Sequence, residues 1–213
     1  MQAIGVLTGD VVGSQQIDNP AVLGSALDEA LALAGAHLGA QGSRYRGDGF
    51  QLAIPDPAQA MTAAILIRAT LIRHSPARQA MWDARIAVAV DEGEIPVTGR
   101  LADARGAAFV RSGRHLDTLG DTSERLVIVT PFSEHESQLS LLTRFADDIV
   151  SHWSHYSAEV VAHSLLHAES QQALANRLGR TQPTINRRLV AARWPLIRDY
   201  LAHVRQLIAE RCT

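Results

Sequence analysis

The order in which apolar patterns follow one another in the N-terminal part of the chain is the feature that most limits its fold. Residues 3–9 form an apolar, β-compatible run, and residues 21–38 then show the apolar spacing of a helix. Two short strands follow at residues 44–55 around a Gly-Asp-Gly turn, then a second helix at 57–73 and a strand at 85–90. This is the ferredoxin-like order, which predicts an α+β sandwich with helices on one face of an antiparallel sheet.

Further elements extend this first domain. After a polar loop, the pattern predicts a helix at about residues 107–119, a strand at 126–130 and a long helix at about 133–153. We therefore assign residues 1–153 to one α/β sandwich domain. A short linker near residues 154–157 would then lead to a second, all-α domain over residues 157–213.

Two aspartates stand beside glycines at predicted strand ends. Asp10 follows the first apolar run, and Asp48 lies in the predicted hairpin turn. Mg²⁺ and Mn²⁺ are typically held by one or two carboxylates together with phosphate oxygens and water, so this pair predicts a metal site for a phosphorylated ligand. Gly13 and Ser14 would offer backbone N–H groups to phosphate. The alternative is structural, because Asp-Gly turns and strand-terminal aspartates are common in hairpins and loops.

Composition restricts the class of protein. With 213 residues, of which 46% are apolar, the chain can build one large or two small domains with a real core. All 20 basic residues are arginine, which we interpret as base composition of the genome and not as a nucleic-acid signal. Cys212 is the only cysteine, so we expect no intrachain disulfide and a cytoplasmic setting. The apolar runs are shorter than the roughly 20 residues of a spanning helix, so we expect no membrane segment.

Charge is distributed unevenly between the two predicted domains. Residues 1–156 contain 12 Arg against 18 Asp and Glu, a balance of -6, and residues 157–213 contain 8 Arg against 4, a balance of +4; together they give the net charge of -2. The C-terminal segment is therefore the basic part of the chain, although a local balance of +4 is modest.

The basic segment contains a pattern that resembles the helix-turn-helix of bacterial transcription regulators. Residues 170–178 predict a short helix opened by a serine N-cap and ended by Gly179, and Thr181 is predicted to cap a second helix with proline in its first turn. Flanking helices are predicted at 158–167 and 195–209. Ala175, Ile185 and Leu189 would pack the two short helices together.

The outward side chains of the second short helix are the DNA-binding candidates. Glutamine, asparagine and arginine suit base edges, and threonine can contact either base or backbone. The candidates for base contact are Gln182, Thr184, Asn186 and Arg187, with Arg188 as a candidate for phosphate contact. The alternative is a packing module without DNA contact.

Four blocks of the N-terminal part resemble the blocks of class III nucleotidyl cyclase domains, in the same order. They are LTGDVVGS, SRYRGDGFQLAI, ARIAVAVDEGEI and DARGAAFVRSGRHL. They resemble the SatD family of bacterial proteins more closely still, and the likeness covers about residues 1–150. The resemblance implies that Asp10 and Asp48 bind the metal, that Arg44 and Asp103 read the purine, and that Arg114 stabilises the transition state. It also implies a homodimer, in which Asp10 and Asp48 of one subunit face Asp103 and Arg114 of the other.

Two departures from the cyclase pattern bear on activity. Val110 occupies the position of an asparagine that partners the transition-state arginine, and valine can donate no hydrogen bond. Loss of one such donor typically lowers turnover by about two to three orders of magnitude. Arg111, the next residue, is a candidate to compensate for it. Arg44 replaces a lysine, which is not a conservative change at a base-reading position. The resemblance therefore favours nucleotide binding over cyclase activity.

We expect a cytoplasmic bacterial DNA-binding regulator whose cyclase-like domain binds a metal-nucleotide, dimerises, or does both. One alternative is a cyclase that makes a cyclic nucleotide from a nucleoside triphosphate and uses the C-terminal domain for docking. Another is a non-catalytic dimerisation scaffold.

Overall fold

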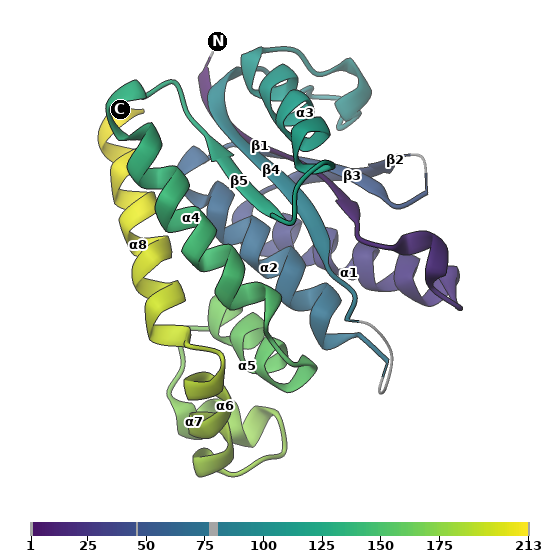
Figure 1. The fold of residues 1–213 in the computed structure, drawn as a ribbon, viewed down its shortest axis with the longest axis vertical. Helices are drawn as coiled ribbons and strands as arrows, with labels where there is room; N and C mark the ends of the chain where they lie inside the picture. The colour runs from purple at the N-terminus through teal and green to yellow at the C-terminus, as the bar shows by residue number, and fades with distance from the viewer. Residues whose placement is uncertain (1, 46, 77–80, 213) are drawn as a thin grey trace.

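A single five-stranded sheet forms the centre of the protein. In the computed structural model, which describes residues 2–45, 47–76 and 81–212, the strand order is β2-β3-β1-β4-β5 (Figure 1). Neighbouring strands are antiparallel except for the parallel pair β4 and β5. The strands are β1 Gln2–Val11, β2 Gln41–Tyr45, β3 Gly49–Ile54, β4 Ala84–Gly93 and β5 Leu126–Val129. The predicted α+β architecture and its order of strands and helices in the N-terminal part are confirmed.

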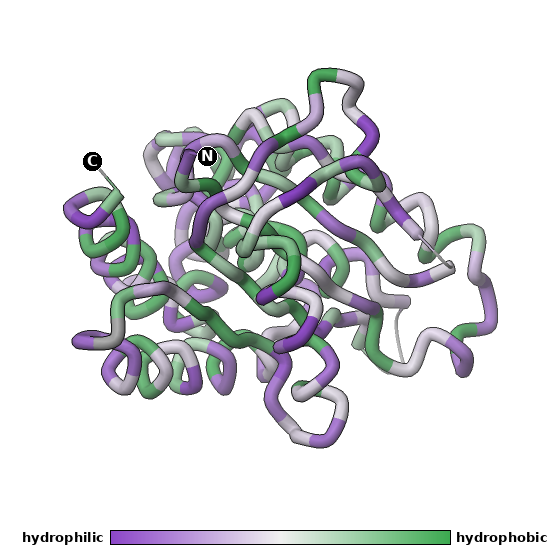
Figure 2. Tube along the Cα trace, turned by 90° about the horizontal axis from the view of Figure 1, so that it is seen from above, coloured by the Kyte–Doolittle hydropathy of each residue, from purple (hydrophilic) through white to green (hydrophobic). Residues whose placement is uncertain are grey.

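Helices cover both faces of the sheet, but unequally. They are α1 Pro20–Leu38, α2 Ala60–Arg73, α3 Ala107–Leu119, α4 Glu136–Ser151, α5 His155–Leu166, α6 Gln171–Arg177, α7 Gln182–Ala191 and α8 Trp194–Arg211. Figure 1 shows α3 on one side of the sheet and α1, α2 and α4 on the other. The predicted arrangement, with helices on one face of an antiparallel sheet, therefore holds for α1 and α2, but α3 and the parallel pair β4 and β5 depart from it. The outer helices alternate hydrophilic and hydrophobic residues along their turns (Figure 2), as expected of helices that pack through one face.

Successive side chains of β1 point alternately toward α3 and toward the layer of α1 and α2. Ile4 and Val6 point to α3 and pack with Ala108, whereas Leu7 and Val11 point to the helix layer around α1 and α2. Since successive side chains of a strand point to opposite faces, Thr8 and Asp10 lie on the α3 side with Ile4 and Val6. The Thr8 hydroxyl is 2.7 Å from the Ser112 hydroxyl of α3.

Helix α2 is the buried centre of the helix layer. Every residue from Ala60 to Ile72 is buried. The N-terminus of α2 approaches β1 so closely that a Cβ on Gly5 would lie 2.6 Å from the Ala60 Cβ. The sequence places glycine at the one point of β1 where this contact leaves no room for a side chain.

A buried ion network ties α2 to the sheet and to α4. Arg68 donates to both carboxylate oxygens of Asp83, at 2.8 and 2.7 Å, and to Asp147 at 2.6 Å. Burial alone would lower the pKa of Arg68, but the two carboxylates raise it, so the guanidinium stays charged. Arg125 also donates to Asp83, at 2.8 Å, so two arginines balance two aspartates. We infer that this network holds three elements in register.

The predicted domain boundary crosses a continuous hydrophobic core. Residues 155–157, assigned to a linker in the sequence analysis, form the first turn of α5, and the Ser154 side chain caps it. Val161 of α5 and Ile197 and Val204 of α8 belong to the same core as α2 and the sheet. The linker assignment was wrong for these residues, because the serine-rich stretch provides a helix cap instead of a tether. The division into two domains stays a prediction.

Helix α1 is unusually apolar for its length. Among the described residues it is the one helix that is long and apolar enough to cross a membrane by length and composition, and 28% of this apolar stretch is buried. The sequence analysis expected no such segment. Asp28 and Glu29, at mid-helix, form ion pairs with Arg44 and with Arg73 respectively. Leu27 on the opposite side is buried in the core, so α1 acts in this fold as an amphipathic layer helix.

Candidate functional site

Backbone pairing brings Asp10, Asp48 and Arg85 to one end of the sheet. Asp10 is directly opposite Gly49 of β3 on one side and opposite Arg85 of β4 on the other. Asp48 immediately precedes Gly49, so its position is next to Asp10. The sheet register alone therefore assembles two carboxylates and one guanidinium from three separate strand ends.

The side chains form a connected polar cluster. Arg85 donates from Nε and Nη2 to the two carboxylate oxygens of Asp10, each at 2.8 Å. The Ser14 hydroxyl donates to Asp48. The pKa of Arg85 is raised, chiefly by the hydrogen bond to Asp10 and further by the charges of Asp10 and Asp48, which together outweigh its partial burial. Both aspartates therefore act on the same guanidinium.

The cluster is open to solvent and has an excess of negative charge. The side chains of Asp10 and Arg85 are 27% and 31% exposed. Gly13, with a left-handed φ of 65°, turns the chain so that Ser14 reaches Asp48. Among the described residues, one arginine faces two carboxylates here, so the cluster attracts a cation and remains reachable from solvent.

A divalent cation fits the donor chemistry of this cluster. Two carboxylates are sufficient when a nucleotide supplies phosphate oxygens. The bidentate hydrogen bond from Arg85 occupies both oxygens of Asp10, so a cation can use them only after the guanidinium turns away. The described part of the chain has no group of three or more His, Cys, Asp or Glu arranged to hold a metal ion. A cation here would therefore depend on its ligand for most of its coordination.

Arg44 lies on the other face of the sheet. It is opposite Phe50, a core residue, and its guanidinium pairs with Asp28 of α1 at 3.2 Å. A Cβ on Gly24 of α1 would meet the Arg44 guanidinium at 2.6 Å, which shows how tightly the arginine lies against this helix. The structure does not bring Arg44 to Asp10 and Asp48 within one chain.

Among the described residues, the remaining cyclase-derived positions form no hydrogen bond or ion pair with the two aspartates. Asp103 ends the short 3₁₀ turn Leu101–Asp103 and pairs with Arg100 at 3.1 Å. Arg114 is exposed on α3, and Val110, one turn earlier, is 52% exposed. Arg111 pairs with Asp91 at 2.9 Å. Within one chain, Val110 and Arg114 therefore lie on the surface, whereas Arg111 is paired with a residue of β4.

The C-terminal candidates divide into exposed and engaged side chains. Ile185 and Leu189 are buried with Ala175 of α6 and Val160 of α5, as the pattern predicts. Asn186 and Arg187 are exposed on α7. Gln182, Thr184 and Arg188 are half-buried: the Gln182 amide donates to Gln171 at 2.9 Å, and the Thr184 hydroxyl is 2.9 Å from that of Thr181. Thr181 stands at the N-cap of α7 but makes no side-chain cap hydrogen bond to its backbone, which corrects its predicted capping role.

Arg188 is the most strongly held of these residues. It donates to Glu159 of α5 at 2.6 Å, and its guanidinium lies 4.6 Å from the centre of the Tyr156 ring. The ion pair and the ring contact together hold α7 against α5. A DNA phosphate would have to compete with the Glu159 carboxylate for Arg188. Asn186 and Arg187 are exposed and would not have to give up a partner on α5 to contact DNA.

Comparisons with known proteins give a limited result. No family model and no curated protein matches the chain. Among solved structures it is similar to a bacterial light-regulated adenylyl cyclase, at 12% identity over 60% of this chain and 75% of that one, with a TM-score of 0.43. It is similar to the active GGEEF domain of a diguanylate cyclase from Vibrio cholerae, at 13% identity over 62% and 85%, with a TM-score of 0.44.

A third similar structure is the guanylyl cyclase Cya2, at 15% identity over 55% of this chain and 70% of that one, with a TM-score of 0.39. All three similar structures are nucleotidyl cyclases. At TM-scores below 0.5 the likeness establishes neither family nor activity. The SatD assignment, the helix-turn-helix and DNA binding find no support in these comparisons.

Arg85 is the site residue that the sequence analysis missed. It was counted as the first residue of an apolar strand, and its side chain was given no role. A signal was present, because a charged residue that opens an otherwise buried strand must face a partner or solvent. The register that places it opposite Asp10 became visible only with the sheet.

Proposed function

We propose that the α/β part of the chain binds a nucleotide at the strand-end cluster, with Asp10 and Asp48 as the carboxylates that hold a Mg²⁺ or Mn²⁺ ion. The observation that supports this is the sheet register, which places Asp10 opposite Gly49, next to Asp48, and opposite Arg85, whose guanidinium donates to both oxygens of Asp10. Carboxylates from two separate strand ends thus act on one guanidinium. When bound, the metal ion would neutralise phosphate charge and orient the phosphates.

Arg85 would exchange its partner when the metal binds. Without a ligand, the Arg85 guanidinium supplies the positive charge that faces Asp10. When a metal ion takes the carboxylates, the guanidinium is free to turn toward phosphate oxygens, for which its planar fork is suited. Ser14 and the backbone at Gly13 would lie beside the same phosphates.

The test is a thermal-shift screen of nucleoside triphosphates with Mg²⁺ and Mn²⁺. A ligand at a hundredfold excess over its dissociation constant stabilises the native state by about 2.7 kcal/mol. Asp10→Asn combined with Asp48→Asn should abolish the metal-dependent shift. Asp199→Asn, an exposed aspartate on α8, is the matched control and should leave the shift unchanged. The same shift in the double variant and in the wild type would remove the two aspartates from the site.

Cyclase activity is the stronger form of the same proposal. Arg114 would then act on the transition state, with Asp103 and Arg44 supplied to the purine across a two-fold dimer. Val110 is exposed, so an asparagine can be placed there without disturbing the core. If the chain is a cyclase limited by this missing donor, Val110→Asn should raise product formation by about two to three orders of magnitude, and Arg114→Ala should lower it.

DNA binding by α7 is a second candidate. It is supported by the exposure of Asn186 and Arg187 and by the balance of +4 in residues 157–213. Asn186→Ala should weaken a preferred sequence by about 1–3 kcal/mol and leave nonspecific binding nearly unchanged. Arg188→Ala should weaken all sequences alike, with a salt slope smaller by about one. Absence of salt-sensitive retardation of genomic fragments would leave α6 and α7 as a packing module.

A further inference from the structure

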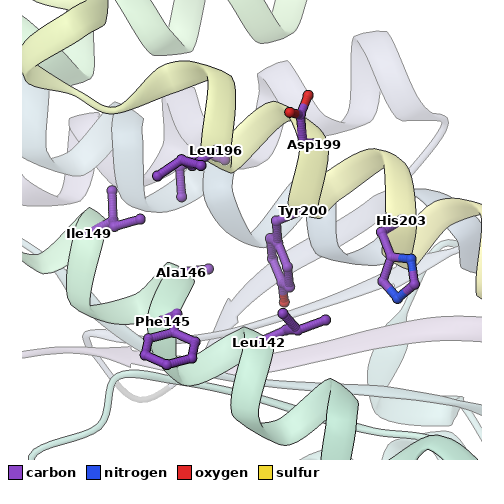
Figure 3. A pocket seen from close by; sticks show the side chains of 9 residues that line it. Leu142, Phe145, Ala146, Ile149, Leu196, Asp199, Tyr200 and His203 are labelled. Carbon is purple, nitrogen blue, oxygen red and sulfur yellow. The ribbon is translucent and has the colours of Figure 1, made fainter.

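An apolar groove lies between α4 and α8, on the side of the sheet away from α3. It has a volume of about 370 Å³. Figure 3 shows the side chains that line it. Leu142, Phe145 and Ile149 line it from α4, and Leu196 and Tyr200 from α8. Phe145 is 62% exposed and Leu196 is 57% exposed. Large apolar side chains that are this exposed and adjacent mark an interaction surface more often than ordinary surface.

The floor of the groove is fixed, so its shape does not depend on a ligand. Tyr200 is buried, and its hydroxyl is 2.8 Å from the Thr143 hydroxyl of α4. This hydrogen bond joins the two helices below the groove. A partner would therefore dock on a preformed surface, without first ordering the two helices.

The sequence of α4 is complementary to itself about a point between residues 145 and 146. In an antiparallel pair of α4 helices centred there, the two copies of Phe145 lie beside each other at the axis, and Leu142 of one copy stands opposite Ile149 of the other. Ala146 takes no part, because it is only 2% exposed and belongs to the core of its own chain. Two aromatic rings thus meet at the centre, and aliphatic residues meet on one flank.

The charged residues of α4 fit the same arrangement. Arg144 and Asp148 are exposed, with side chains 61% and 75% accessible, and lie four residues apart on one flank of the helix. In an antiparallel pair of identical helices, like flanks meet. Arg144 of each copy would therefore lie within one residue of the level of Asp148 in the other, giving two ion pairs across the axis. A parallel pair would bring this flank against the other flank of the partner helix, so these two ion pairs would not form.

We infer that the groove between α4 and α8 is the contact surface for a second copy of this chain, paired through antiparallel α4 helices with α8 beside each. This inference is independent of the proposed nucleotide site, because α4 and Arg85 are on different parts of the fold. It also differs from the dimer that the cyclase resemblance implies, in which the α3 side, with Arg114, faces the partner.

The first test is the mass of the protein in solution by light scattering at micromolar concentration. Phe145→Glu should halve the mass of the assembly, because it introduces a carboxylate at the centre of the contact. Val22→Glu is the control, since Val22 is an exposed apolar residue on α1, outside the groove. A wild-type monomer, or an assembly that Phe145→Glu leaves intact, would overturn the inference.

Charge reversal tests the antiparallel register. Arg144→Glu alone should weaken the dimer, because it places a glutamate near Asp148 of the partner; adding Asp148→Arg should restore it. Arg144 also pairs with Glu124 in its own chain at 2.7 Å, so circular dichroism of each variant must separate dimer loss from unfolding. Failure of the second change to restore the dimer in a folded protein would contradict the proposed register.

A disulfide provides a readout that does not depend on weakening the contact. Cys212 is the only cysteine, so Cys212→Ser gives a cysteine-free background. Phe145→Cys in that background should form a covalent dimer on oxidation, because the two copies of this position lie beside the axis. Val22→Cys should remain monomeric under the same conditions, and equal cross-linking at both positions would overturn the inference.

Discussion

Two clusters near the start of β4 use the same chemistry in opposite environments. In each, two aspartates act on one arginine: Arg68 donates to both Asp83 and Asp147, whereas Arg85 donates to Asp10 and feels Asp48 through its charge. The side chains of Arg68 and Asp83 are 0% and 1% exposed, whereas those of Arg85 and Asp10 are 31% and 27% exposed. The buried cluster is completed by Arg125 and is charge-balanced, but the open cluster keeps an excess of carboxylate among the described residues. Exposure and balance together separate a packing element from a candidate binding site.

The largest expected effect is the loss of the buried arginine. Arg68→Ala leaves Asp83 and Asp147 buried, with only Arg125 to compensate them, and breaking such a pair typically costs about 3–5 kcal/mol. Urea unfolding followed by circular dichroism measures the change. A loss below about 1 kcal/mol, the range of surface ion pairs, would mean that the network is not the structural element described here.

The same network should make stability sensitive to acid. Burial alone would raise the pKa of Asp83, but Arg68 and Arg125 lower it below the ordinary value. A depressed folded-state pKa contributes stability above the unfolded pKa of about 3.9, and this contribution is lost as pH falls through the lower folded value. Unfolding free energies across the acidic range should therefore fall less steeply for Asp83→Asn than for the wild type. Parallel pH profiles would contradict this assignment.

At the open cluster, the expected effect is on ligand binding. The Asp10→Asn and Asp48→Asn double variant should lose a metal-nucleotide stabilisation of about 2.7 kcal/mol at a hundredfold excess over the dissociation constant. Its unfolding free energy without ligand should change little, because the carboxylates are partly exposed. If the double variant lost as much unfolding free energy as Arg68→Ala, the open cluster would be a stabilising packing element like the buried one.

The smallest expected effect is that of Arg85→Ala on stability. A partly exposed ion pair contributes about 0–1 kcal/mol, so the unfolding free energy should hardly move. Mn²⁺ alone should bind more tightly, since the competing cation is gone, while the nucleotide should gain less from the metal. Titration calorimetry with Mn²⁺, with and without nucleotide, measures both changes. Weaker Mn²⁺ binding in the variant would contradict competition between the metal and Arg85.

The sequence predicted the order of elements well because local periodicity carries that information. The apolar run before Asp10, the hairpin around Asp48 and the serine cap at Ser170 were all visible without tertiary contacts. The role of Arg85 was hidden, since it depends on the register between β1 and β4. The roles of Arg68 and Asp147 were hidden as well, because each looks like an ordinary charged helix residue in the sequence and only long-range packing buries it.

The direct passage from α4 into α5 has a practical consequence for dissecting this protein. Cutting the chain near residue 154 would strip α5 and α8 from α2 and leave apolar faces of both fragments in water. The basic C-terminal segment should then be poorly soluble when expressed alone, and a failure of that fragment to retard DNA would say nothing about the whole protein. Binding assays therefore need the intact chain with single substitutions.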